Sequence, residues 1–157
     1  MSPLFAKLNF KGHARILAID APASFESELA ALNEVAVDRA PSSGEPYGFA
    51  IGFAVARADL DRVSAQLIAA APGDAVVWVA YPKKTSKRYR CDFDRDSGWT
   101  VLGDAGFEPV RQVAIDEDWS ALRFRRVEFI KTMKRSASMA LSEQGKARTG
   151  RVKPSVD

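Results

Sequence analysis

The stretch YPKKTSKRYR, from Tyr81 to Arg90, concentrates side chains that could bind a charged ligand. It follows the apolar run AVVWVAY, so the basic residues would leave the end of a buried strand. Cations, hydroxyls and backbone N–H groups on one loop favour an anion, such as a phosphate, a carboxylate or a nucleic-acid backbone. The candidate ligand-binding residues of this stretch are Tyr81, Lys83, Lys84, Thr85, Ser86 and Lys87.

Further candidate ligand-binding residues come from other parts of the chain: Asp20, Asp116, Trp119 and Arg123. Asp20 and Asp116 each end an apolar run, and the carboxyl ends of parallel strands meet at the edge of the sheet where ligands bind. The lysines would position phosphates, while Tyr81 and Trp119 would stack on a base. The leading hypothesis is a non-enzymatic domain that binds an anionic ligand, either a phosphate-containing metabolite or nucleic acid.

Two other functions fit the same residues. In an enzyme or small-metabolite binder, Asp20 or Asp116 would act as acid or base, and Lys84 would stabilise negative charge. In a structural or protein-interaction module, the lysines would pair with these acids and hold the edge together. Such a module would meet a second copy through an uncovered sheet face, so a homodimer is one of the expected assemblies.

Missing motifs exclude several activities. The turn after the first apolar run reads DAPASF, without the glycines of a dinucleotide-binding turn, and the chain has no P-loop. The DFDRDSG segment places Gly98 one position too late for a calcium loop. His13 and Cys91 are the single residues of their types, which argues against a Ser-His-Asp triad, a zinc site or an internal disulfide. Arginines near Cys91 would lower the pKa of its thiol. No metal and no cofactor is expected.

Apolar runs separated by helical patterns predict the element order β-α-β-α-β-α-β-β. The predicted strands cover residues 14–22, 47–56, 75–81, 109–115 and 120–129, the predicted helices lie within residues 24–36, 57–74 and 95–106, and a loop covers residues 38–46. Ser24 would cap the first helix, and the aspartates of DFDRDSG would cap the third. On the last strand, Arg123 and Arg125 would share a face and reach Asp116 or Asp118.

These elements make a small Rossmann-like α/β sheet with a closing antiparallel hairpin. With the first strand at the edge, all helices would cover one face; with it between the second and third, the first helix would cover the opposite face. Residues 1–130 would form a single α/β domain, and residues 131–157 a basic, flexible C-terminal tail. No run of about 18 apolar residues and no secretory signal is found, so no membrane span is expected and the cytoplasm is the expected location.

Three short motifs carry a resemblance to a known family: AP after the first strand, YPK after the third, and D-x-x-W-S-A-L-R-F at the hairpin. With these motifs, over residues 14–130, the chain resembles a family of small bacterial proteins known as domain of unknown function 3052. The resemblance implies a compact α/β domain and brings no established activity. The layout also looks like the second half of a Rossmann-type methyltransferase, which closes with a similar hairpin. Because the glycine-rich turn is missing, this second resemblance extends to the fold only.

Overall fold

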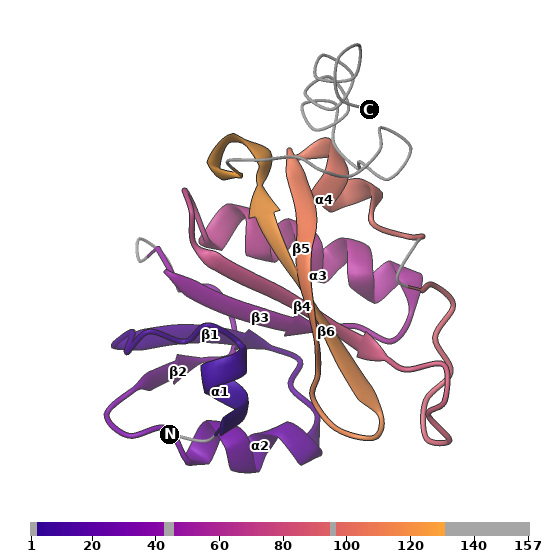
Figure 1. Ribbon diagram of the computed structural model, residues 1–157, viewed down its shortest axis with the longest axis horizontal. Helices are drawn as coiled ribbons and strands as arrows, with labels where there is room; N and C mark the ends of the chain where they lie inside the picture. The colour runs from indigo at the N-terminus through magenta and orange to yellow at the C-terminus, as the bar shows by residue number, and fades with distance from the viewer. Residues whose placement is uncertain (1–2, 43–45, 95–96, 131–157) are drawn as a thin grey trace.

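One mixed sheet organises the chain in the computed structural model, which describes residues 3–42, 46–94 and 97–130 (Figure 1). The six strands are β1 (Arg15–Ile19), β2 (Ala36–Asp38), β3 (Phe49–Phe53), β4 (Val76–Pro82), β5 (Phe107–Ala114) and β6 (Trp119–Arg126). The helices are α1 (Pro3–Lys7), α2 (Ala23–Ala30), α3 (Arg57–Ala70) and α4 (Thr100–Asp104), and a short 3-10 helix covers Val127–Phe129. The strands lie in the order β2-β1-β3-β4-β6-β5.

Strand directions confirm the predicted Rossmann-like α/β fold and its closing hairpin. Strands β2, β1, β3 and β4 run parallel, β6 runs antiparallel to β4, and β5 runs antiparallel to β6. Strand β5 therefore points the same way as β4, and the carboxyl ends of β1, β3, β4 and β5 share one edge. The loop that follows β4 and the turn between β5 and β6 meet at this edge, because Pro82 pairs with Trp119.

The strand arrangement differs from both predicted alternatives, because β2 was not predicted. This strand includes the last residue of the predicted helix, Ala36, and the first residue of the predicted loop, Asp38. It has three residues, is at most half-buried and carries no alternating pattern. It places β1 between β2 and β3. The direction in which successive strands are added therefore reverses at β1. Helix α2 connects β1 to β2 on one side of it, and α3 connects β3 to β4 on the other side. Right-handed crossovers in opposite directions place the two helices on opposite faces of the sheet.

Two apolar clusters fill the two faces. On one face, α2 and the unpredicted α1 pack on the sheet, and the Trp78 indole N–H donates to the carbonyl of Leu8 at 2.7 Å. On the other face, α3 packs on β3, and α4 packs against α3 and β5. A methyl group at Gly52 would lie 2.2 Å from Val63 Cγ1. Helix α3 therefore lies directly on β3 at Gly52, where a larger residue would not fit.

Three local predictions are wrong, each because a side chain finds a more distant partner. Helix α2 begins after Pro22, so Ser24 is not its cap. Asp92 Oδ1 accepts the backbone N–H of Arg57 at 2.6 Å, so it caps the N-terminus of α3 rather than that of α4. The Arg125 guanidinium lies against Asp74 at 2.7 Å instead of the turn acids, because antiparallel β6 carries it to the opposite edge of the sheet.

Within the described ranges, no helix is long and apolar enough to cross a membrane. The predicted basic tail, residues 131–157, lies outside the described residues.

Candidate functional site

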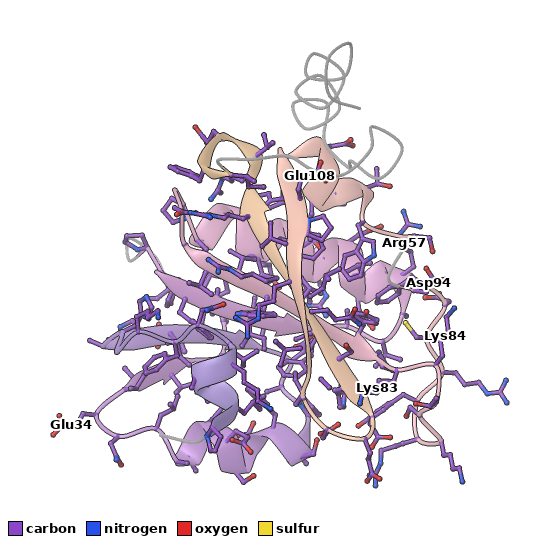
Figure 2. All side chains as sticks on the ribbon, viewed as in Figure 1. Glu34, Arg57, Lys83, Lys84, Asp94 and Glu108 are labelled. Carbon is purple, nitrogen blue, oxygen red and sulfur yellow. The ribbon has the colours of Figure 1, made fainter. Side chains whose placement is uncertain are left out.

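A cavity of about 1070 Å³ opens at the carboxyl end of β4. Its walls come from four parts of the chain: the end of β4, the loop that follows it as far as Ser97, the end of β5, and the start of β6. The loop runs along one side of the molecule, and Lys83, Lys84 and Asp94 lie along it (Figure 2). The cavity thus lies where the sequence predicted a site, at the strand ends.

Three polar side chains form the floor of this cavity. The Gln112 amide donates to the Tyr81 hydroxyl at 3.1 Å and to the Ser120 hydroxyl at 3.0 Å. Tyr81 and Ser120 are each 5% exposed, whereas Gln112 is exposed, so this cluster joins two buried side chains to one at the surface. The Tyr81 ring contacts Phe93 and Trp99, which fix its position. The floor can therefore orient a polar group of a bound molecule while aromatic rings contact its apolar part.

Charged side chains flank the mouth of the cavity. Lys84 Nζ lies 3.8 Å from Asp94 Oδ2, with the lysine side chain 85% exposed. The Asp94 carboxylate also accepts the Ser97 hydroxyl at 3.1 Å. A carboxylate and an ammonium side by side could accept a proton and stabilise negative charge, respectively.

The Cys91 thiol lines the same cavity but is not activated as predicted. Burial raises its pKa, and the charges of Asp92 and Asp94 add to this effect. The predicted lowering by arginines is wrong, because burial and the two carboxylates raise the pKa of the thiol. The thiol is therefore a poor nucleophile at neutral pH.

The loop after β4 is held in place by the turn of the β5–β6 hairpin. The backbone N–H of Lys83 donates to the Asp118 carbonyl, and the Ser86 hydroxyl donates to the Asp118 carboxylate, both at 2.8 Å. Ser86 Oγ in turn accepts the backbone N–H groups of Arg88 and Tyr89 at 3.2 Å. The Arg88 guanidinium lies 3.6 Å from the Asp118 carboxylate. These bonds hold the loop at the edge of the sheet and keep the cavity open.

The structure brings together half of the predicted site residues. Tyr81, Lys83, Lys84, Thr85 and Ser86 line the cavity, whereas Lys87 lines a neighbouring hollow with Thr85, Arg88, Glu117 and Asp118. The remaining four residues, Asp20, Asp116, Trp119 and Arg123, are absent from the cavity lining. The predicted site is therefore divided among several places.

Those four residues have contacts inside the protein. The Asp20 carboxylate accepts Arg62 at 2.6 Å, and Asp116 Oδ1 accepts the backbone N–H groups of Asp118 and Trp119 at 2.8 Å. Trp119 is 3% exposed and packs against Phe53.

Arg123 donates to the Asn9 side chain, far from the turn acids, and burial lowers the pKa of its guanidinium. All four residues thus stabilise the fold in this structure.

Gln112, Ser120 and Asp94 line the cavity but were not among the candidate ligand-binding residues of the sequence. Gln112 and Ser120 are polar residues within predicted strands, and polar positions among apolar neighbours were the available signal. Their partnership with Tyr81 depends on the pairing of Tyr81 with Ser120 across β4 and β6. Strand register was not predictable, so neither was this cluster.

The described residues form neither a cluster of metal ligands nor a site around His13. In that part of the chain, no three His, Cys, Asp or Glu side chains come together as metal ligands. His13 precedes β1, at the edge opposite the cavity, and its ring packs against Phe10 and Phe49. Burial lowers the pKa of His13, so the neutral ring is favoured. His13 therefore belongs to the core.

No protein-family model matches the chain, and no curated protein matches it. Among solved structures, it is similar to the N-methyltransferase NodS from Bradyrhizobium japonicum WM9. The two share 12% identity with a TM-score of 0.50, over 78% of this chain and 92% of NodS. NodS has also been solved in complex with S-adenosyl-L-homocysteine.

Two other methyltransferases show lower structural similarity. The ribosomal protein L11 methylase from Lactobacillus delbrueckii subsp. bulgaricus has a TM-score of 0.44 and 14% identity, over 73% of this chain and 59% of the methylase. Magnesium protoporphyrin IX methyltransferase from Synechocystis PCC 6803 has a TM-score of 0.42 and 15% identity, over 78% of this chain and 74% of that enzyme.

The comparison with NodS shows a Rossmann-like α/β fold. The hypothesis of a non-enzymatic anion-binding domain is contradicted by this comparison, because the matching fold is that of an enzyme. The geometry of the edge gives a physical reason for the error. Two of the basic residues of this loop lie beside carboxylates, Lys84 next to Asp94 and Arg88 next to Asp118.

Proposed function

We propose that this chain is an enzyme that binds a small organic substrate in the cavity at the carboxyl end of β4. The observation that supports the proposal is the cavity itself, with its size and its polar floor. A volume of about 1070 Å³ is at the upper end of the range for small-molecule sites. Apolar walls with a few convergent polar groups are typical of such sites.

The floor supplies recognition. Gln112 donates to both Tyr81 and Ser120, and Ser120 is then able to donate its own hydroxyl hydrogen to a ligand. A substrate carbonyl or hydroxyl would bind here, with its apolar part against the ring of Phe93. A ligand without such a polar group would offer no acceptor to the Ser120 hydroxyl hydrogen, which costs affinity.

Asp94 and Lys84 supply the acid–base chemistry of the proposed reaction. The enzyme hypothesis from the sequence paired Lys84 with Asp20 or Asp116, but the carboxylate beside Lys84 in the structure is Asp94. The carboxylate would accept a proton from the substrate, and the ammonium would stabilise the negative charge that forms.

Substrate binding is tested with a library of small aromatic and heterocyclic compounds and ¹H–¹⁵N NMR spectra of the full chain. We expect hits that shift the side-chain amide signals of Gln112 and bind at least about tenfold more weakly to Gln112→Ala. Arg111→Ala is the matched control, because Arg111 is exposed on the same strand and does not line the cavity. Hits that bind Gln112→Ala as well as the wild type, or no hits at all, would refute the proposed site.

Catalysis is tested by incubating the protein with a bacterial metabolite extract and following each compound by mass spectrometry. The wild type is expected to consume at least one compound, and Asp94→Asn to do so about 10² to 10⁴-fold more slowly. Asp104→Asn serves as the control and should match the wild type, because Asp104 is exposed on α4 and does not line the cavity. An extract left unchanged by the wild type, or consumed equally by Asp94→Asn, would rule out this reaction.

Methyl transfer is the reaction that the fold suggests, since NodS is an N-methyltransferase solved with S-adenosyl-L-homocysteine. It would require a nucleoside cofactor in the crevice beyond β1 and β3. The residues of this chain do not fit such a cofactor there, and the reaction proposed for the cavity has no step through it.

A further inference from the structure

The crevice beyond β1 and β3 is where a Rossmann-like sheet would bind a nucleotide. Chain order reverses at this point, since α2 leads from β1 to β2 on one side and β3 lies on the other. A nucleotide site there uses a glycine-rich turn after β1, backbone N–H groups at the start of the next helix, and an acidic residue about 20 residues further on for the ribose. Each of these requirements can be compared with the structure.

The acidic residue for the ribose is present as Asp38, but its carboxylate already accepts hydrogen bonds within the chain. Asp38 ends β2, and its side chain is 19% exposed. Arg15 donates to one carboxylate oxygen at 2.8 Å, and the Tyr47 hydroxyl donates to the other. Tyr47 is 2% exposed and its oxygen also accepts the backbone N–H of Ser42 at 3.0 Å. A ribose would have to displace a buried tyrosine to reach this carboxylate.

The end of β2 carries a cation instead of a free acid. Arg39 follows Asp38 and forms two hydrogen bonds with Glu26 of α2, at 2.7 and 2.8 Å. This bidentate pair joins the end of β2 to the helix that would cover the nucleoside. Paired in this way, the guanidinium and the carboxylate fix the distance between the two elements.

The turn after β1 is closed by its own residues. Asp20 has φ 58, a left-handed conformation that aspartate tolerates, so the chain turns sharply here without glycine. Pro22, the residue before α2, has no N–H to offer an anion. The Asp20 carboxylate is joined to Arg62 of α3 at 2.6 Å. The turn therefore lacks the glycine that permits close approach of a pyrophosphate, and Pro22 removes one backbone donor at the start of α2.

Aromatic side chains fill the space between α2 and the hairpin. The Phe25 and Phe53 rings lie 4.9 Å apart, and the Phe53 and Trp119 rings lie 5.2 Å apart. All three side chains are at most 3% exposed. Outside them, the Ser24 hydroxyl donates to Asp116 at 3.3 Å. Helix α2 is therefore tied to the β5–β6 turn across the crevice.

We infer that this chain does not take up S-adenosylmethionine in the crevice beyond β1 and β3, because its own side chains occupy the positions that the cofactor needs. The chain has a Rossmann-like fold with this crevice closed. The inference is independent of the substrate proposed for the cavity.

The test is a calorimetric titration of the full chain with S-adenosylmethionine and with S-adenosyl-L-homocysteine, up to about 1 mM, together with ¹H–¹⁵N NMR spectra. We expect no saturable binding that shifts the backbone signals of Asp20, Ala21 and Ser24. The inference would be overturned by saturable binding with a dissociation constant below about 100 μM. Such binding would have to shift the signals of these residues, and its affinity would have to fall at least tenfold in Asp38→Asn.

A third outcome separates this inference from the proposed function. Saturable binding that shifts Gln112 and Ser120, is weakened by Gln112→Ala and is unchanged in Asp38→Asn would place the nucleoside in the cavity. It would uphold the closed crevice. Thermal melting of each variant confirms that it is folded, and Arg111→Ala is again the matched control.

Discussion

Beyond β1 and β3 the carboxyl edge of the sheet is filled by side chains, whereas beyond β4 it holds a cavity of about 1070 Å³. The two regions are neighbours on one edge and contain similar residue types: aspartates, arginines and aromatic rings. In the crevice these groups bind one another, as Asp20 binds Arg62 and Phe53 packs on Trp119. In the cavity the floor hydroxyls of Tyr81 and Ser120 surround open space.

Connection length explains the difference. Residues 20–22 join β1 to α2, so the helix lies directly against the end of the sheet and its aromatic residues fill the crevice. Residues 83–99 join β4 to α4, and residues 83–94 of this connection run along one side of the molecule instead of covering the sheet (Figure 1). Its contacts with Asp118 hold it there. Binding residues are frequent on such long loops, because a rigid sheet positions them.

The largest expected effect is on the packing of the closed crevice. Phe53→Ala should lower the free energy of unfolding by about 3–5 kcal/mol, because it empties the space between Phe25 and Trp119. Urea denaturation measures this loss. Thr85→Ala, exposed at the cavity mouth, is the control and should stay within about 0.5 kcal/mol of the wild type. A loss below about 1 kcal/mol for Phe53→Ala would mean that the crevice is loosely packed and can open.

Thiol reactivity tests the cavity. Burial and two neighbouring aspartates raise the pKa of Cys91, so little thiolate forms near neutral pH. Alkylation by iodoacetamide at pH 8, followed by mass spectrometry, should be several-fold slower in the native chain than in urea. Asp94→Asn removes one of the two charges and should raise the native rate. Native alkylation as fast as in urea would contradict the buried environment described for this thiol.

A smaller effect is expected at the cavity floor. Tyr81→Phe removes the hydroxyl that accepts the Gln112 amide and should lower the free energy of unfolding by about 0.5–1.5 kcal/mol. Gln112 still donates to Ser120, which limits the loss. Thermal and urea denaturation measure it, and the same variant should bind the library hits more weakly. A loss as large as that of Phe53→Ala would make the floor a packing element and remove its contrast with the crevice.

The smallest expected effect is a change in acid sensitivity. The pKa of Asp38 is lowered below its ordinary value of about 3.9, mainly by the hydrogen bond from Tyr47 and to a smaller extent by Arg15. Asp38 therefore stabilises the fold above about pH 4, and this contribution is lost as the pH falls through the lowered pKa. In Tyr47→Phe the pKa returns towards its ordinary value. The decrease in urea midpoint from about pH 5 to about pH 3 should then be smaller than in the wild type.

A matched control sharpens this last measurement. Thr85→Ala should show the same decrease as the wild type, since it leaves Asp38 and its partners unchanged. An equal decrease in Tyr47→Phe would mean that Tyr47 does not hold the carboxylate, which would weaken the case for a closed crevice.

The amino-acid sequence by itself determined the central elements of this fold. The apolar runs that form β1, β3 and β4 and the periodic pattern of α3 are local features, and burying them requires a layered α/β structure. The break after Tyr81 also indicated where the chain leaves the sheet, which placed the cavity loop at the correct edge. The elements that were missed, α1 and β2, are five and three residues long and have no pattern of their own.

Tertiary structure alone decided which of the candidate residues work together. Asp116 meets Ser24 across 92 positions in the chain, and Gln112 meets Tyr81 across 31. Such partners depend on strand order and register, and one short unpredicted strand, β2, placed α2 on the opposite face from α3. Local sequence patterns predict which side of a helix or strand is buried, because this depends on the residues of that segment alone. Whether a carboxylate is paired or free depends on what the folded chain brings next to it.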